Sequence, residues 1–81
     1  MRIEYLPHFQ REFIKLPPQI QGKFRKQVAS LLRDIRYPSL RAKKYNEDKG
    51  IWQARADDNY RFYFRIEGDR YILLNIRRHK D

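Results

Sequence analysis

Cysteine is absent from this sequence of 81 residues, glycine is rare, and long apolar runs are missing. Without thiols the chain has no disulfide framework and no thiolate metal site. His8 and His79 lie at opposite ends of the sequence, so we do not expect a zinc site built from them. No apolar run approaches the ~20 residues that span a bilayer, and the N-terminus lacks the apolar stretch of a signal peptide. These absences predict a cytoplasmic protein without metal, cofactor or membrane span.

Acidic residues are also scarce relative to basic ones. Nineteen Lys and Arg oppose ten Asp and Glu, which gives a formal net charge of +9. Residues 23–44 contain eight of the basic residues and a single acid, Asp34. Self-repulsion on this scale destabilises a compact chain, so it usually reflects an anionic partner. Nucleic acid is the first candidate because neutralised phosphates release counterions, an anionic membrane surface is the second and an acidic protein the third. A basic protein whose charge is simply solvated remains an alternative.

Hydrophobic periodicity predicts two helices in the first half of the chain. Residues 2–6 alternate as a short strand does. Apolar residues then recur at helical spacing through residues 8–16 and again through residues 20–35. The Pro17-Pro18 pair separates these segments, because proline ends one helix but suits the first turn of the next. Residues 39–50 are interpreted as a basic connector.

Alternation returns in the second half of the chain, in residues 51–56, 60–67 and 71–77. Gly68-Asp69 is typical of a tight hairpin turn between the last two segments. In residues 71–77 the alternation places Ile72, Leu74 and Ile76 inward. Together with the first half, this predicts one domain, 1–81, because two pieces would be too small to bury a core. The expected α+β fold has the order β-α-α-β-β-β, with an N-terminal helical hairpin on one face of a small, mainly antiparallel four-stranded sheet.

Two helices can cover only one face of such a sheet, so the other face meets solvent or a partner. Alternation gives that face a polar set: Gln53, Arg55, Arg61, Tyr63, Arg65, Asn75 and Arg77. Guanidinium groups bind phosphate in bidentate fashion, and tyrosine stacks on bases. We therefore expect the functional site on this face. The alternative is structural: Arg61 would then pair with Asp57, Asp58 or Glu67.

Several short motifs together resemble the RelE/ParE toxin superfamily, over essentially the whole chain. They are Leu16-Pro17-Pro18-Gln19-Ile20, Tyr37-Pro38-Ser39-Leu40, Lys49-Gly50-Ile51-Trp52, Asn59-Tyr60-Arg61-Phe62-Tyr63 and Arg77-Arg78-His79. The resemblance implies a RelE-like fold and the toxin of a type II toxin–antitoxin system, neutralised by a cognate antitoxin protein. Closest are the RelE/YoeB-like mRNA interferases, which are ribosome-dependent mRNA endonucleases. A ParE-like DNA gyrase poison is an alternative, as is a weakened relative that binds its antitoxin and, through that complex, operator DNA.

The resemblance also implies roles for individual residues. Arg61 matches the arginine that faces the scissile phosphate in RNA-cutting members. Arg55 falls near a basic residue on their preceding strand, and Gln53 takes a place that some members fill with lysine. His79 matches the catalytic histidine of the YoeB-like branch.

Two departures from that branch affect the expected site. Ala42 and Lys80 stand where the YoeB-like members have a glutamate and a tyrosine. The chain stops at Asp81 and offers no C-terminal tyrosine of the kind that RelE-like members use. The resemblance therefore implies the fold and an incomplete YoeB-type site.

Metal-independent RNA cleavage is feasible with the remaining residues, because RNA carries its own nucleophile. We predict that Arg61, with Arg55 and Arg77 assisting, stabilises the charge of the transition state. His79 is the expected general acid or base, since imidazole titrates near neutrality. Further contacts with the messenger RNA or the ribosome are expected from Lys43, Lys44, Gln53, Tyr63, Arg78, Lys80 and, on the second helix, Lys23, Lys26 and Arg33.

Overall fold

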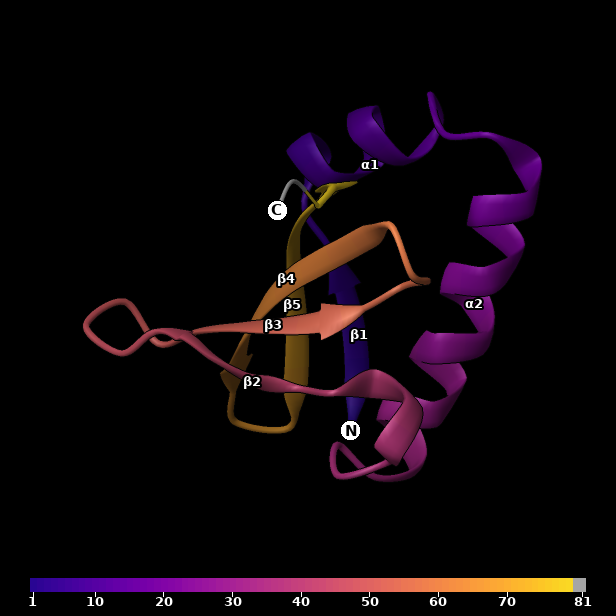
Figure 1. Ribbon diagram of the computed structural model, residues 1–81. Coiled ribbons are helices and arrows are strands. Elements are labelled where there is room, and N and C mark those ends of the chain that lie inside the picture. Colours follow the sequence, from indigo (N-terminus) through magenta and orange to yellow (C-terminus); the bar gives the residue numbers. More distant parts are fainter. Residues whose placement is uncertain (80–81) are drawn as a thin grey trace.

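The computed structural model of the protein describes residues 1–79 (Figure 1). Its elements are β1 (Arg2–Tyr5), α1 (Pro7–Phe13), α2 (Pro18–Arg33), the short 3-10 helix η1 (Pro38–Leu40), β2 (Lys43–Asn46), β3 (Ile51–Arg55), β4 (Tyr60–Glu67) and β5 (Arg70–Arg78). The predicted α+β fold is confirmed, with the correction that the sheet has five strands and not four. Within residues 1–79, no helix is both long and apolar enough to cross a membrane.

The five strands form one sheet in the order β1-β5-β4-β3-β2. β1 runs parallel to β5, and the other neighbouring pairs are antiparallel. The additional strand is β2, which lies at one edge within the predicted connector. Three of its four residues are exposed. An exposed edge strand has no apolar face, so hydrophobic alternation does not reveal it.

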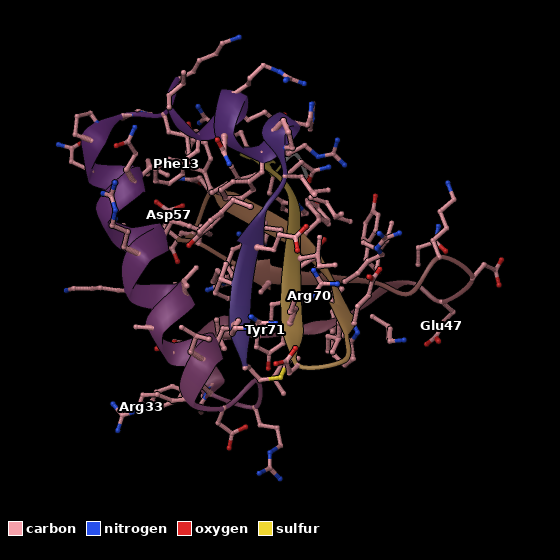
Figure 2. All side chains as sticks on the ribbon, turned by 180° about the vertical axis from the view of Figure 1, so that it is seen from behind. Phe13, Arg33, Glu47, Asp57, Arg70 and Tyr71 are labelled. Carbon is pink, nitrogen blue, oxygen red and sulfur yellow. The ribbon has the colours of Figure 1, made fainter. Side chains whose placement is uncertain are left out.

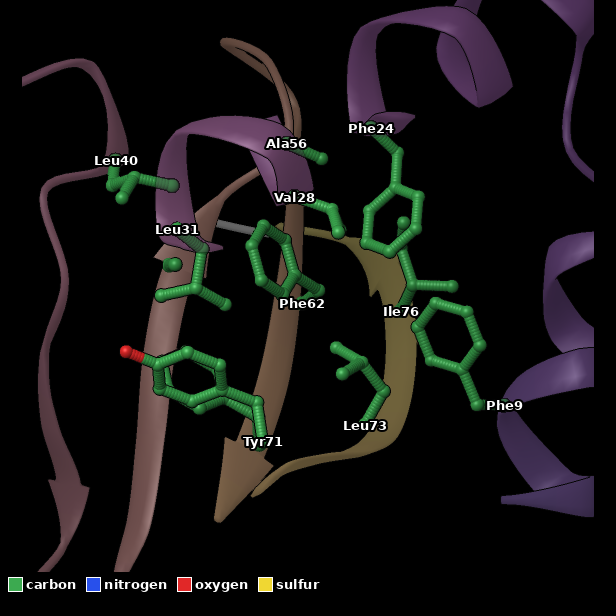
Figure 3. Packing of buried hydrophobic residues seen from close by; sticks show 12 residues of the cluster. Phe9, Phe24, Val28, Leu31, Leu40, Ala56, Phe62, Tyr71, Leu73 and Ile76 are labelled. Atoms are coloured by element: carbon green, nitrogen blue, oxygen red, sulfur yellow. The ribbon is translucent and has the colours of Figure 1, made fainter. Parts of the chain in front are cut away.

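The core lies between the helices and one face of the sheet (Figure 3). Phe24 of α2 joins the layers: its ring centroid is 5.2 Å from that of Phe9 in α1 and 5.1 Å from that of Phe62 in β4. The other buried members of this cluster are Val28, Leu31, Leu40, Ala54, Ala56, Phe64, Tyr71, Leu73 and Ile76. Both helices contribute to this one cluster, so the opposite face of the sheet has no helical cover among the described residues (Figure 1).

A β-bulge interrupts the alternation of β5. Tyr63 pairs with Asn75, but the next residue, Phe64, pairs with Leu73. Leu74 is therefore the extra residue of the bulge. Side chains along a strand alternate between the two faces of the sheet. One inserted residue therefore moves each side chain that precedes it in β5 to the face opposite the predicted one.

This bulge corrects the predicted orientation of β5. Tyr71 and Leu73 belong to the core, whereas Ile72 and Leu74, which the sequence places inward, lie outside the core cluster. Beyond the bulge the alternation is as predicted, with Ile76 inward. Beyond the bulge, Asn75 and Arg77 therefore lie on the polar face of the sheet, as predicted, where they pair with Tyr63 and Arg61.

Side-chain hydrogen bonds fix the helices to the end of the sheet where β5 terminates. The Glu12 carboxylate of α1 accepts the backbone N–H of Ile76 at 3.0 Å. Gln27 of α2 donates its amide to the carbonyls of Ser39, at 2.9 Å, and Arg55, at 2.7 Å. These bonds hold β5, β3 and η1 in a fixed relation at this end of the molecule.

Candidate functional site

Strand register aligns basic side chains across the uncovered face of the sheet. Arg55 of β3 pairs with Arg61 of β4, and Arg61 in turn pairs with Arg77 of β5. Paired residues on neighbouring strands point to the same face, with Cβ atoms roughly 5 Å apart. Three guanidinium groups from three strands therefore share one row of the sheet.

A pocket of 330 Å³ lies at the end of this row. It is lined by Arg41, Lys43, Gln53, Arg55, Arg61 and His79. The backbone N–H of His79 donates to the carbonyl of Asn59 at 2.7 Å, which fixes the residue after β5 beside the start of β4. All of these residues except Arg41 were predicted from the sequence. The structure thus brings Arg61 and His79 together, although 17 positions separate them in the sequence.

The guanidinium group of Arg61 is held by the turn between β3 and β4. Its Nη1 donates to three backbone carbonyls, those of Asp57 at 2.9 Å, Asp58 at 3.3 Å and Tyr60 at 3.1 Å. Within residues 1–79 no carboxylate forms an ion pair with this group, in contrast to the structural alternative considered above. Carbonyl groups orient the guanidinium without cancelling its charge, so Arg61 retains a positive charge for an anionic ligand.

Arg55 has a different environment. Its Nη1 lies 3.4 Å from Oδ1 of Asp58, and the Asp58 side chain is 92% exposed. The Nε of Arg55 is buried and has no hydrogen-bond partner. The exposed Asp58 carboxylate is held only weakly, and the Arg55 guanidinium has an unsatisfied donor. Arg55 is therefore suited to exchange Asp58 for an oxygen of an anionic ligand.

Two further pockets extend the first one in opposite directions. A pocket of 500 Å³ beside α2 is lined by Lys23 and Lys26 and shares Arg41 and Arg55 with the first pocket. A pocket of 370 Å³ on the other side shares Gln53 and His79 with it. The residues that complete this third pocket are Tyr45, Tyr63, Arg77 and Arg78. We call the three pockets together the basic groove. A continuous groove of this kind suits an extended polyanion.

Comparisons in sequence find no relative: no protein-family model matches the chain, and no curated protein matches it. Solved structures do match. A YoeB/ParE toxin from Agrobacterium tumefaciens superposes with a TM-score of 0.81 at 16% identity, covering 99% of this chain and 100% of the toxin. A RelBE toxin–antitoxin complex from Mycobacterium tuberculosis superposes with a TM-score of 0.76 at 20% identity, covering 96% of each chain. The YoeB–YefM complex from Staphylococcus aureus superposes with a TM-score of 0.76 at 12% identity, covering 96% of this chain and 95% of the matched chain. The protein has the RelE/ParE toxin fold.

Two predicted site residues, Lys44 and Arg33, do not line the groove. The Nζ of Lys44 lies 5.3 Å from the ring centroid of Trp52, which packs against the core on the opposite face. Arg33 lies at the end of α2 remote from Asp57 (Figure 2). Lys80 lies outside the described residues. We therefore omit Lys44 and Arg33 from the proposed site, and the role of Lys80 stays a prediction from the sequence.

Arg41 and Tyr45 are among the groove residues that were not predicted from the sequence. Arg41 follows η1 with φ at 46°, in the left-handed region that residues other than glycine rarely adopt. Its side chain lines two of the three pockets. Tyr45 is skipped in the pairing of β2 with β3, where the register shifts between Lys44 and Asn46. Neither a left-handed residue nor a bulge has a hydrophobic pattern, so periodicity does not reveal them.

Among residues 1–79, no group of three or more His, Cys, Asp or Glu side chains is arranged to hold a metal ion.

Proposed function

We propose that this protein is a cytoplasmic toxin of a type II toxin–antitoxin system that cuts messenger RNA on the ribosome. The observation that carries the proposal is the pocket shared by Arg55, Arg61 and His79. It combines charge for a phosphate with an imidazole that can accept or donate a proton. The RelE/ParE fold supports the same assignment.

The cleavage step uses the nucleophile of the RNA itself. The 2′-oxygen attacks the adjacent phosphorus while a general base accepts its proton, and the P–O5′ bond breaks as an acid protonates the leaving oxygen. The products are a 2′,3′-cyclic phosphate and a 5′-hydroxyl end. Arg61 binds the non-bridging oxygens, where negative charge develops, and Arg55 and Arg77 assist. His79 carries one of the two protons.

The groove also accounts for the positioning of a long substrate. Lys23 and Lys26 extend the positive charge along α2 beyond the pocket. Contacts of lysine with phosphate provide affinity and register without reading bases. Lys43 and Arg78, which line the other two pockets, add further phosphate contacts. We propose messenger RNA and ribosomal RNA as the ligands of this surface.

The proposed regulatory partner is a cognate antitoxin. The matched RelBE structure is a toxin–antitoxin complex, and the matched Staphylococcus aureus structure is a complex of YoeB with YefM. A net charge of +9 favours an acidic protein partner by the same electrostatics that favour RNA. In this proposal the antitoxin protein links the toxin to operator DNA.

A cell-free translation reaction tests the proposal, with transcript ends mapped in the presence and absence of ribosomes. We expect cuts within codons in the ribosomal A site, with 5′-hydroxyl ends, and no cuts in naked RNA. The variants Arg61→Ala and His79→Ala should leave transcripts intact and remove growth inhibition. Intact transcripts with the unaltered protein, accompanied by stalled gyrase complexes, would instead establish a ParE-like gyrase poison. Intact transcripts without any growth defect would establish a non-catalytic relative.

A further inference from the structure

The third pocket of the basic groove differs from the other two because it is aromatic. The ring centroids of Tyr45 and Tyr63 are 4.9 Å apart, with an interplanar angle of 67°. The guanidinium carbon of Arg77 lies 5.0 Å from the Tyr63 centroid. Tyr63 is only 6% exposed, because the side chains of Tyr45 and Arg77 pack on its ring.

Tyr45 is the accessible member of this group, with 55% of its surface exposed. It belongs to an edge strand and is not part of the hydrophobic core. Tyr45 lies on the same side of the sheet as the groove, where its ring contacts that of Tyr63, whereas its neighbour Lys44 contacts Trp52 on the other side. The fold thus presents an aromatic ring at a position where it contributes little to stability.

Gln53 connects this aromatic pocket with the pocket of Arg61 and His79, because it lines both. It is 8% exposed and is the only buried polar residue among those described. Its amide carries both donor and acceptor groups, which match the edge of a nucleobase. The first and third pockets share Gln53 and His79, so a nucleotide whose phosphate occupies the first pocket has its own base next to the third.

We propose that the third pocket is a nucleobase subsite, in which one base next to the cleaved phosphate stacks on Tyr45 and meets the Gln53 amide along its edge. Single-stranded RNA is commonly recognised by aromatic stacking combined with hydrogen bonds to base edges. The subsite would determine which base flanks the cut. This inference rests on the proposed function for its ligand, and it assigns to Tyr45 a role that the sequence did not indicate.

The test compares two uncleavable probes of equal charge: a 2′-O-methyl RNA trinucleotide and a sugar–phosphate trimer without bases. Fluorescence anisotropy at one fixed salt concentration measures the affinity of each. Stacking on an aromatic side chain predicts a loss of roughly 5- to 140-fold in trinucleotide affinity for Tyr45→Ala. The affinity for the base-free trimer should stay within about twofold of the unaltered protein, since Tyr45 contributes no charge. Tyr45→Phe keeps the ring and should retain most of the trinucleotide affinity.

Tyr37→Ala is the matched control, because Tyr37 is 42% exposed and lines none of the three pockets. It should bind both probes as the unaltered protein does. The proposal is overturned if Tyr45→Ala binds the trinucleotide normally, or if it loses both probes equally. Ribosome-dependent cleavage is measured separately on the same variants. Base-dependent binding through Tyr45 without any cleavage would reject the proposed function alone, whereas cleavage with unchanged probe binding in Tyr45→Ala would reject the base subsite alone.

Discussion

Replacing Asp58 by asparagine removes the carboxylate that pairs with Arg55 in the basic groove. The Asp58 side chain is 92% exposed, and its one ion pair among the described residues is the contact of 3.4 Å with Arg55. The backbone carbonyl of Asp58, which accepts a hydrogen bond from Arg61, is unaffected by this substitution. We therefore expect the fold to be maintained and the charge of Arg55 to become more available to RNA.

The magnitude follows from the exposure of the pair. Exposed ion pairs contribute ~0.2–1 kcal/mol, because water and salt screen them. If RNA phosphate displaces Asp58 from Arg55, that amount is regained in the variant. Since 1.4 kcal/mol corresponds to a tenfold change in affinity, Asp58→Asn should bind RNA about 1.5- to 5-fold more tightly.

Fluorescence anisotropy with an uncleavable RNA oligonucleotide at ~0.1 M salt measures this change, since charges more than about 10 Å apart are largely screened there. Asp48→Asn is the matched control, because it changes net charge equally but lies in the loop between β2 and β3, outside the groove. We expect the control to gain less than the Asp58 variant. Equal gains in both variants, or weaker binding by Asp58→Asn, would show that the pair with Arg55 does not compete with RNA.

Two further predictions concern the framework of the site. Asp57→Ala should lower the free energy of unfolding, measured by urea denaturation, by about 1.5–3 kcal/mol. The reason is that the Asp57 carboxylate accepts hydrogen bonds from the backbone N–H groups of Asn59 and Tyr60, both at 2.9 Å. Unchanged stability would mean that the turn does not depend on these two hydrogen bonds. Phe62→Ala should cost about 3–5 kcal/mol in the same assay, because Phe62 is fully buried and contacts Phe24. A loss below ~1 kcal/mol would contradict the packing described here.

The middle of the sheet could be predicted from the sequence because its alternation is uninterrupted. In β4, Phe62 and Phe64 face the core, as predicted from their spacing. Arg61 and Tyr63 consequently face the other way, and register then aligns Arg61 with Arg55 and Arg77. A period of two fixes the face of every residue as long as no residue is inserted.

The edges of the groove could not be predicted, because local backbone irregularities determine them. The bulge at Leu74 reversed the predicted orientation of Ile72, and a register shift interrupts the unpredicted edge strand that carries Tyr45. The left-handed backbone of Arg41 is a third irregularity. Each depends on tertiary packing around one residue and leaves no periodic pattern in the sequence.

The basic helix α2 shows a different limit of sequence reasoning. Lys23, Lys26 and Arg33 all lie on α2 and were assigned one role. The structure places the Nζ of Lys23, which lines the groove, 3.7 Å from Oδ2 of Asp57, and it places Arg33 at the opposite end of the helix (Figure 2). Where the ends of a helix lie relative to the sheet depends on how the helix packs, which composition alone does not encode.

The central claim is that Arg61 acts on the phosphodiester that is cut, and single-turnover cleavage on programmed ribosomes tests it most directly. The measurement compares Arg61→Ala with Arg33→Ala, which removes the same charge from a residue outside the groove. We expect the rate for Arg61→Ala to fall by roughly 100- to 1,000-fold, as on removal of one donor to the transition state, and Arg33→Ala to stay within about threefold of the unaltered protein. Cleavage by Arg61→Ala at the unaltered rate, or equal losses in both variants, would contradict the account.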